Sequence, residues 1–74
     1  MKEVYYILSG EGEFGTWERV VATARGIKRR LAKERCGGDR FARAFTVAER
    51  GETLCMMCDI ESGATRLVSS EVVQ

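Results

Sequence analysis

The sequence predicts an α+β fold in which one helix packs on one face of an antiparallel sheet of four to five strands, in the order ββαβββ. Three observations support this prediction. Segments rich in aromatic and β-branched residues alternate with short turns that contain glycine and acidic residues. One segment alone, residues 24–35, has the apolar spacing of a helix. The 74 residues contain no repeat, so we expect a single small domain over residues 1–74.

The first two strands are predicted at residues 3–9 and 16–22, joined by the glycine-rich connection 10–15. In the first strand, strict alternation places Val4, Tyr6 and Leu8 on one face and Tyr5 and Ile7 on the other. Because both faces are apolar, this strand is expected at the centre of the sheet. The two strands are expected to form a hairpin.

The helix is expected to begin after Thr23, whose hydroxyl suits the N-cap position. Ala24, Ile27 and Leu31 then form a narrow apolar stripe on an otherwise basic segment. The pair of glycines at 37 and 38 supplies the left-handed turn that ends many helices.

Three strands are predicted after the helix, at residues 40–48, 53–60 and 65–72, with turns at 49–52 and 61–63 and a frayed end at 73–74. In the strand at 40–48, one face is bulky and includes Phe41 and Phe45, and the other is small and includes Ala42 and Ala44. Periodicity leaves two possibilities open. Either the alanines let the helix pack closely, or the phenylalanines form the core face.

The charge is unevenly distributed along the chain. Residues 23–45 hold eight bases and two acids, a local charge of +6, whereas the rest of the chain has a charge of −5. An exposed block of one sign attracts partners of the opposite sign, although such a block is also common on helix faces that serve solubility alone. At 100° per residue, Arg25, Arg29, Arg30 and Lys33 spread over the side of the helix opposite the apolar stripe, and Lys28 and Arg35 fall at the margin of the stripe. The candidate partner-binding residues on this basic helix are Arg25, Lys28, Arg29, Lys33 and Arg35.

The composition argues against several functional classes. Histidine is absent, which removes imidazole from any nucleophile pair or metal site, and we expect no catalytic residues, no cofactor and no small-molecule substrate. Cys55 and Cys58 have C-x-x-C spacing, but in a strand they would point to opposite faces, so we expect packed thiols and no metal. The chain has no apolar run of membrane-spanning length and no signal-peptide pattern, and we expect a cytoplasmic protein.

Two further features of the sequence have more than one interpretation. The stretch from Gly10 to Gly15 reads G-x-G-x-x-G, but a strand-like segment follows it and its two glutamates would repel phosphate, so a hairpin loop is expected. The aromatic residues could stack on bases of a single-stranded nucleic acid beside the arginines, or could simply form the core: Tyr5, Tyr6, Trp17, Phe41 and Phe45.

The element order, the start Met1-Lys2 with Tyr5 and Ile7, and the pairs Lys28-Arg29 and Lys33-Glu34 followed by Cys36 resemble a small phage-encoded anti-CRISPR family. The resemblance implies a non-enzymatic inhibitor of type I CRISPR surveillance complexes (Cascade), acting in the host bacterial cytoplasm. Lys28, Arg29 and Lys33 match basic helix positions of that family, whereas Arg35 replaces a neutral polar residue.

The resemblance implies that the partner is Cascade, chiefly its repeated backbone subunits, and that binding blocks pairing of the guide with target DNA. It also implies non-specific contact with DNA. The basic helix itself argues against mimicry of DNA by acidic residues. The alternative is a small nucleic-acid-binding regulatory module that uses the same basic face.

Overall fold

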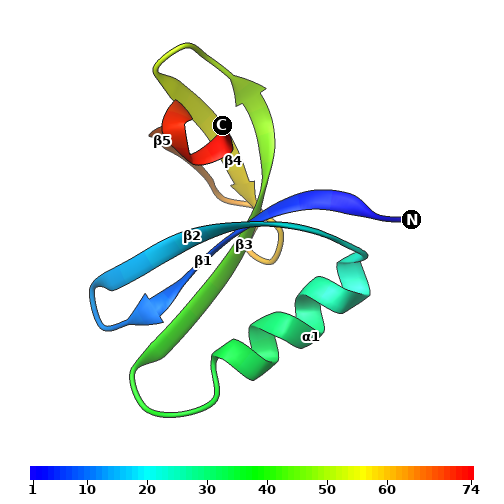
Figure 1. The fold of residues 1–74 in the computed structure, drawn as a ribbon, viewed down its shortest axis with the longest axis vertical. Coiled ribbons are helices and arrows are strands. Elements are labelled where there is room, and N and C mark those ends of the chain that lie inside the picture. The colour runs from blue at the N-terminus through cyan, green and yellow to red at the C-terminus, as the bar shows by residue number, and fades with distance from the viewer.

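The computed structural model describes all residues, 1–74, and confirms the α+β fold with the order ββαβββ (Figure 1). The elements are β1 (Glu3–Glu11), β2 (Phe14–Ala22), α1 (Ala24–Glu34), β3 (Arg40–Arg50), β4 (Leu54–Asp59), β5 (Thr65–Ser69) and the 3₁₀ helix η1 (Ser70–Val73). Neither helix has the length and apolar character that crossing a membrane requires.

The five strands form one antiparallel sheet in the order β2-β1-β3-β4-β5, so β1 is a central strand as predicted. β1 pairs with β2 along its whole length, but with β3 only between Tyr6, opposite Phe45, and Glu11, opposite Arg40. Beyond Phe45, β3 pairs with β4 instead. β3 is therefore shared by two halves of the sheet, which turn away from each other in Figure 1.

Each face of the sheet has its own core. The core under α1 consists of Tyr5, Ile7, Ile27, Leu31, Ala42 and Ala44. The core on the opposite face consists of Tyr6, Phe45, Met57 and Val68. Both readings of the strand at 40–48 are thus correct, because the alanines of β3 receive the helix while Phe45 fills the second core.

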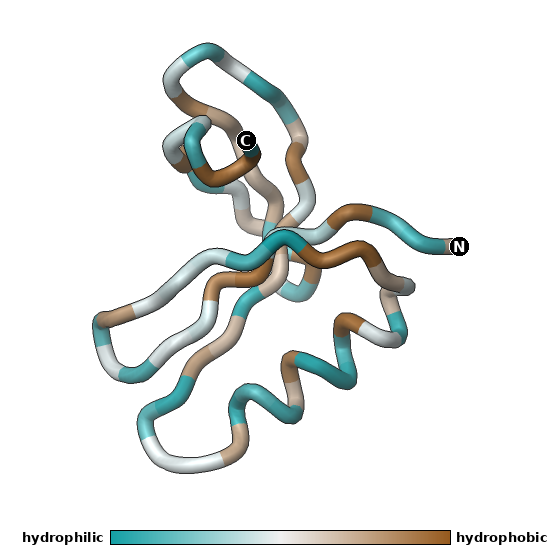
Figure 2. The backbone as a smooth tube through the Cα atoms, viewed as in Figure 1, coloured by the Kyte–Doolittle hydropathy of each residue, from teal (hydrophilic) through white to brown (hydrophobic).

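The ends of α1 follow from local chemistry. The Thr23 hydroxyl accepts a hydrogen bond from the Gly26 N–H at 3.0 Å, as expected of an N-cap. Gly37 and Gly38 have φ values of 99° and 52°, a region that side chains disfavour, and they turn the chain out of the helix. Between these ends, apolar and polar segments alternate along α1 (Figure 2).

Three predictions about the second half of the chain are wrong in detail. The strand predicted at 65–72 ends at Ser69, because the Ser69 hydroxyl accepts a hydrogen bond from the Glu71 N–H and starts η1. Val73, expected to fray, packs with Val72 against the second core. The turn predicted at 49–52 begins later, since β3 runs to Arg50 past an irregularity between Val47 and Glu49.

The packing of α1 on small residues yields a stability prediction. Ala44 is fully buried under α1, whereas Ala48, four residues along the same strand, is exposed. Ala44→Leu should lower the free energy of unfolding by about 1–3 kcal/mol, because the added methylenes would push the helix off the sheet. Urea denaturation measures this. Ala48→Leu is the matched control, and equal stability of the two variants would contradict the described packing.

Candidate binding surface on the helix

The outward side of α1 carries four cations. α1 buries only Ile27 and Leu31, and these two residues fix its rotation on the sheet. The opposite side of the helix then faces solvent. Four of the five predicted binding residues are exposed there, and none of them makes an ion pair or a side-chain hydrogen bond within the molecule. We call this surface the helix cation face: Arg25, Lys28, Arg29 and Lys33.

Arg30, on the flank of the same helix, is held by the molecule's own carboxylates. Its guanidinium forms a two-pronged ion pair with Glu18 of β2, with Nη1 to Oε2 at 3.1 Å. Its Nε also lies 3.8 Å from a carboxylate oxygen of Glu34. The hydrogen bond from Arg30 lowers the pKa of Glu18, and the same bond raises the pKa of Arg30. Arg30 therefore fastens α1 to β2.

Arg35, the fifth predicted binding residue, is placed differently from the other four. Its Nε and Nη2 donate to the Ala42 carbonyl at 3.0 and 2.7 Å, and the guanidinium also pairs with Glu61. Ala42 lies on the stretch of β3 that β4 does not reach, so Arg35 covers an unpaired carbonyl at a strand edge. The hydrogen bond from Arg35 lowers the pKa of Glu61. Arg35 therefore connects the end of α1 to β3 and to the turn after β4.

The field at the helix cation face is positive because the nearby acids are already engaged. Glu18 pairs with Arg30, and Glu34 pairs with both Arg30 and Arg40. The first turn of α1 contains no acid to offset the positive end of the helix dipole. The surface can therefore attract and hold an anionic partner.

Asp59, at the end of β4, is a buried carboxylate with only 4% of its surface exposed. Its Oδ1 accepts hydrogen bonds from the N–H groups of Glu61 and Ser62 at 2.8 and 3.2 Å, and Oδ2 pairs with Arg43 at 3.3 Å. Burial alone would raise the pKa of Asp59, but these donors together lower it below the ordinary value. Asp59 organises the turn that presents Glu61 to Arg35.

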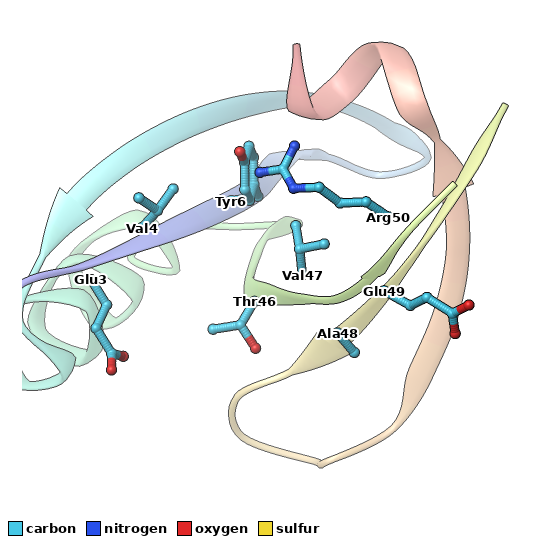
Figure 3. A pocket seen from close by; sticks show the side chains of 8 residues that line it. All are labelled: Glu3, Val4, Tyr6, Thr46, Val47, Ala48, Glu49 and Arg50. Atoms are coloured by element: carbon cyan, nitrogen blue, oxygen red, sulfur yellow. The ribbon is translucent and has the colours of Figure 1, made fainter. Parts of the chain in front are cut away.

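A groove opens where β1 and β3 separate (Figure 3). Its volume is about 570 Å³, and its lining comes from the start of β1 and the end of β3: Glu3, Val4, Tyr6, Thr46, Val47, Ala48, Glu49 and Arg50. None of the five predicted binding residues contributes to it. The groove is a consequence of the fork between the two halves of the sheet.

The three cysteines are free thiols in separate environments. Cys55 is buried with its sulfur 3.5 Å from the Ser70 hydroxyl oxygen, Cys58 is half-buried near the Gly63 carbonyl, and Cys36 is exposed after α1. No three cysteine or acidic side chains come together in an arrangement that could hold a metal ion.

The sequence interpretation overlooked a second group of cations, on the sheet face opposite α1. Arg19, Arg50 and Arg66 are exposed there and make no ion pair. Strand alternation alone could have placed Arg19 beside Trp17, but the register between strands was needed to place Arg66 near them.

Comparison of the chain with protein-family models, with curated proteins and with solved structures finds no match. The structure brings together Arg25, Lys28, Arg29 and Lys33, and separates Arg35 from them.

The two kinds of helix arginine should differ in their effect on stability. Arg35→Gln should lower the free energy of unfolding by about 1 kcal/mol, because it removes hydrogen bonds to Ala42 and Glu61 at a partly exposed site. Arg29→Gln, which loses no contact, should change it by less than about 0.5 kcal/mol. Chemical denaturation of both variants measures the difference, and a larger loss for Arg29→Gln would contradict the assignment.

The buried carboxylate makes part of the stability dependent on pH. Since the pKa of Asp59 is lower in the folded chain than its ordinary value of 3.8, ionised Asp59 stabilises the fold above that pH, and the contribution disappears as the pH falls through the folded-state value. Asp59→Asn should therefore be less stable than the parent at neutral pH and approach it in acid.

Urea denaturation of both chains between neutral pH and about pH 3 tests this expectation. Asp39→Asn, at an exposed carboxylate, is the control and should follow the parent chain. A stability difference for Asp59→Asn that stays constant over this range would contradict the expectation.

Proposed function

We propose that this protein is a non-enzymatic anti-CRISPR inhibitor that binds the type I Cascade complex through the helix cation face and blocks pairing of guide and target DNA. One observation carries the proposal. Arg25, Lys28, Arg29 and Lys33 lie exposed on one side of α1 with no carboxylate of the chain to neutralise them. Such a surface docks to an acidic or nucleic-acid surface.

The arrangement is not explained by helix stability. Arg25 stands in the first turn, where a cation opposes the helix dipole at a general cost of about 0.3–1 kcal/mol. By contrast, the arginines that stabilise the fold, Arg30 and Arg35, turn toward Glu18 and Glu61. The separation of engaged from free cations supports a binding role for the free ones.

The resemblance to the anti-CRISPR family supports Cascade as the partner. Lys28, Arg29 and Lys33 are the positions that match, and all three belong to the helix cation face. The observed element order is also the one on which the resemblance was based. Arg35, which departs from the family, is engaged with Ala42 and Glu61, so the proposed contact rests on the other four residues.

A nucleic-acid-binding module using the same face is the second candidate. The face offers only lysine and arginine, which bind phosphates through their charge and can also donate to guanine edges, but it has none of the amide side chains that read adenine. Binding of this kind weakens steeply with added salt.

The charge reversal Lys28→Glu with Arg29→Glu tests the proposal. The parent chain should retain a purified type I Cascade complex in a pull-down and inhibit its binding of target DNA. The doubly reversed variant should lose at least tenfold in affinity, because two attractive contacts become repulsive. The fold of the variant is checked by circular dichroism.

Lys2→Glu with Arg50→Glu is the matched control, since it makes the same change of charge away from α1. Failure to retain any type I complex, or equal losses in both double variants, would overturn the proposal. Titration of labelled duplex and single-stranded DNA at two salt concentrations separates the second candidate. Tight, salt-sensitive duplex binding that is lost on reversal of Lys28 and Arg29, without retention of Cascade, would favour it.

A further inference from the structure

The sheet face opposite α1 combines exposed arginines with aromatic rings. Register places Trp17, Leu8 and Arg43 side by side across β2, β1 and β3. Two residues earlier in β1, the neighbouring row on the same face consists of Arg19, Tyr6, Phe45 and Asp59. We define the sheet patch as two exposed arginines and two half-buried rings on this surface: Arg19, Arg66, Trp17 and Phe41.

Phe45 lies beneath the patch and contacts both Trp17 and Arg66. It is 2% exposed, and the Trp17 ring lies against it with ring centroids 5.4 Å apart. The Arg66 guanidinium lies over the Phe45 ring, 5.7 Å from its centroid. Trp17 and Arg66 come from opposite halves of the sheet, so Phe45 brings an aromatic ring and a cation together at the surface.

Phe41 extends the aromatic surface toward the β1–β2 hairpin. A Cβ atom at Gly15 would lie only 2.9 Å from the end of the Phe41 ring, so the ring lies close over the backbone of that glycine. Gly15 is two residues from Trp17 on β2, about 7 Å along the strand. Gly15, the last glycine of the G-x-G-x-x-G stretch, has no side chain and therefore leaves space for the half-buried Phe41 ring near Trp17.

The patch is cationic because the strand carboxylates avoid it. Glu3, Glu11, Glu18 and Glu49 all belong to the other face by strand alternation and register. The one strand carboxylate on this face, Asp59, is buried and engaged with Arg43 and two backbone N–H groups. Arg19 and Arg66 are left exposed and unpaired.

We propose that the sheet patch binds single-stranded nucleic acid, with Arg19 and Arg66 on phosphates and bases stacked on Trp17 and Phe41. The patch supplies both of the features that single-strand recognition uses, a cationic path and aromatic platforms on a sheet. A duplex keeps its bases stacked on one another and cannot use the rings. The site is separate from the helix cation face, which lies on the other side of the sheet.

Trp17 is the only tryptophan in the chain and reports on the site directly. Titration with an oligothymidylate of about ten nucleotides should quench its fluorescence, because a base stacked on the indole changes its environment. The same amount of duplex DNA should leave the fluorescence nearly unchanged, even where it binds α1.

Arg19→Gln with Arg66→Gln should weaken oligothymidylate binding at least tenfold. It should also reduce the dependence of log affinity on log salt by about 1.4, since two phosphate contacts are lost. Arg25→Gln with Arg29→Gln, the same change on the helix cation face, should leave the quenching intact. Arg19→Gln alone should also weaken binding. Because this variant loses no internal contact, its weaker binding cannot be attributed to misfolding.

The absence of quenching at low salt would overturn the assignment, as would equal quenching by duplex or loss of binding only in the helix variant. Because the readout involves no Cascade, this test stands apart from that of the proposed function. Retention of Cascade without quenching would reject the sheet patch alone, and quenching without retention of Cascade would reject the inhibitor proposal alone.

Discussion

The contact of Ile27 and Leu31 with the alanine stripe of β3 is the constraint on which the remaining surface depends. Two apolar residues give α1 little buried area, so a small change in its rotation would expose one of them. Arg30 and Arg35 reinforce the contact from two directions, one toward β2 and the other toward β3 and the turn after β4. With the rotation fixed in this way, every other cation of the helix has to face solvent.

The division of the sheet into two halves also leaves cations at the surface. Because β3 serves two halves, the chain builds two small cores on opposite faces, and each leaves cations on its outer side. Of the acids, five are in internal ion pairs, and Glu3 and Glu49 are unpaired on the strand face opposite the sheet patch. A net charge of +1 therefore conceals two positively charged surfaces, one helical and one on the sheet. These surfaces suit different partners, because the helix protrudes and the sheet carries aromatic rings.

Much of the fold was predictable because the alternation and capping signals were local. Thr23 and the glycines at 37 and 38 bound the helix in the sequence as they do in the structure. The role of Arg35 was not predictable, since its partner Glu61 lies 26 residues away and is positioned by the Asp59 turn. The sheet patch was equally hidden, because Arg19 and Arg66 become neighbours of Phe45 only through the register of all five strands. The end of β5 was missed because η1 uses valines that are equally suited to a strand.

The orientation of α1 is measured most directly by the exchange of arginine side-chain N–H groups with water, followed by NMR in the free protein. We expect slow exchange of the Nε–H of Arg35, which donates to the Ala42 carbonyl, and of the Arg30 guanidinium paired with Glu18. Arg25 and Arg29 should exchange fast, as free arginine does in water. Protection of Arg25 and Arg29 equal to that of Arg35 would mean that the helix is rotated or that its cations are engaged internally, and the helix cation face would then not exist as described.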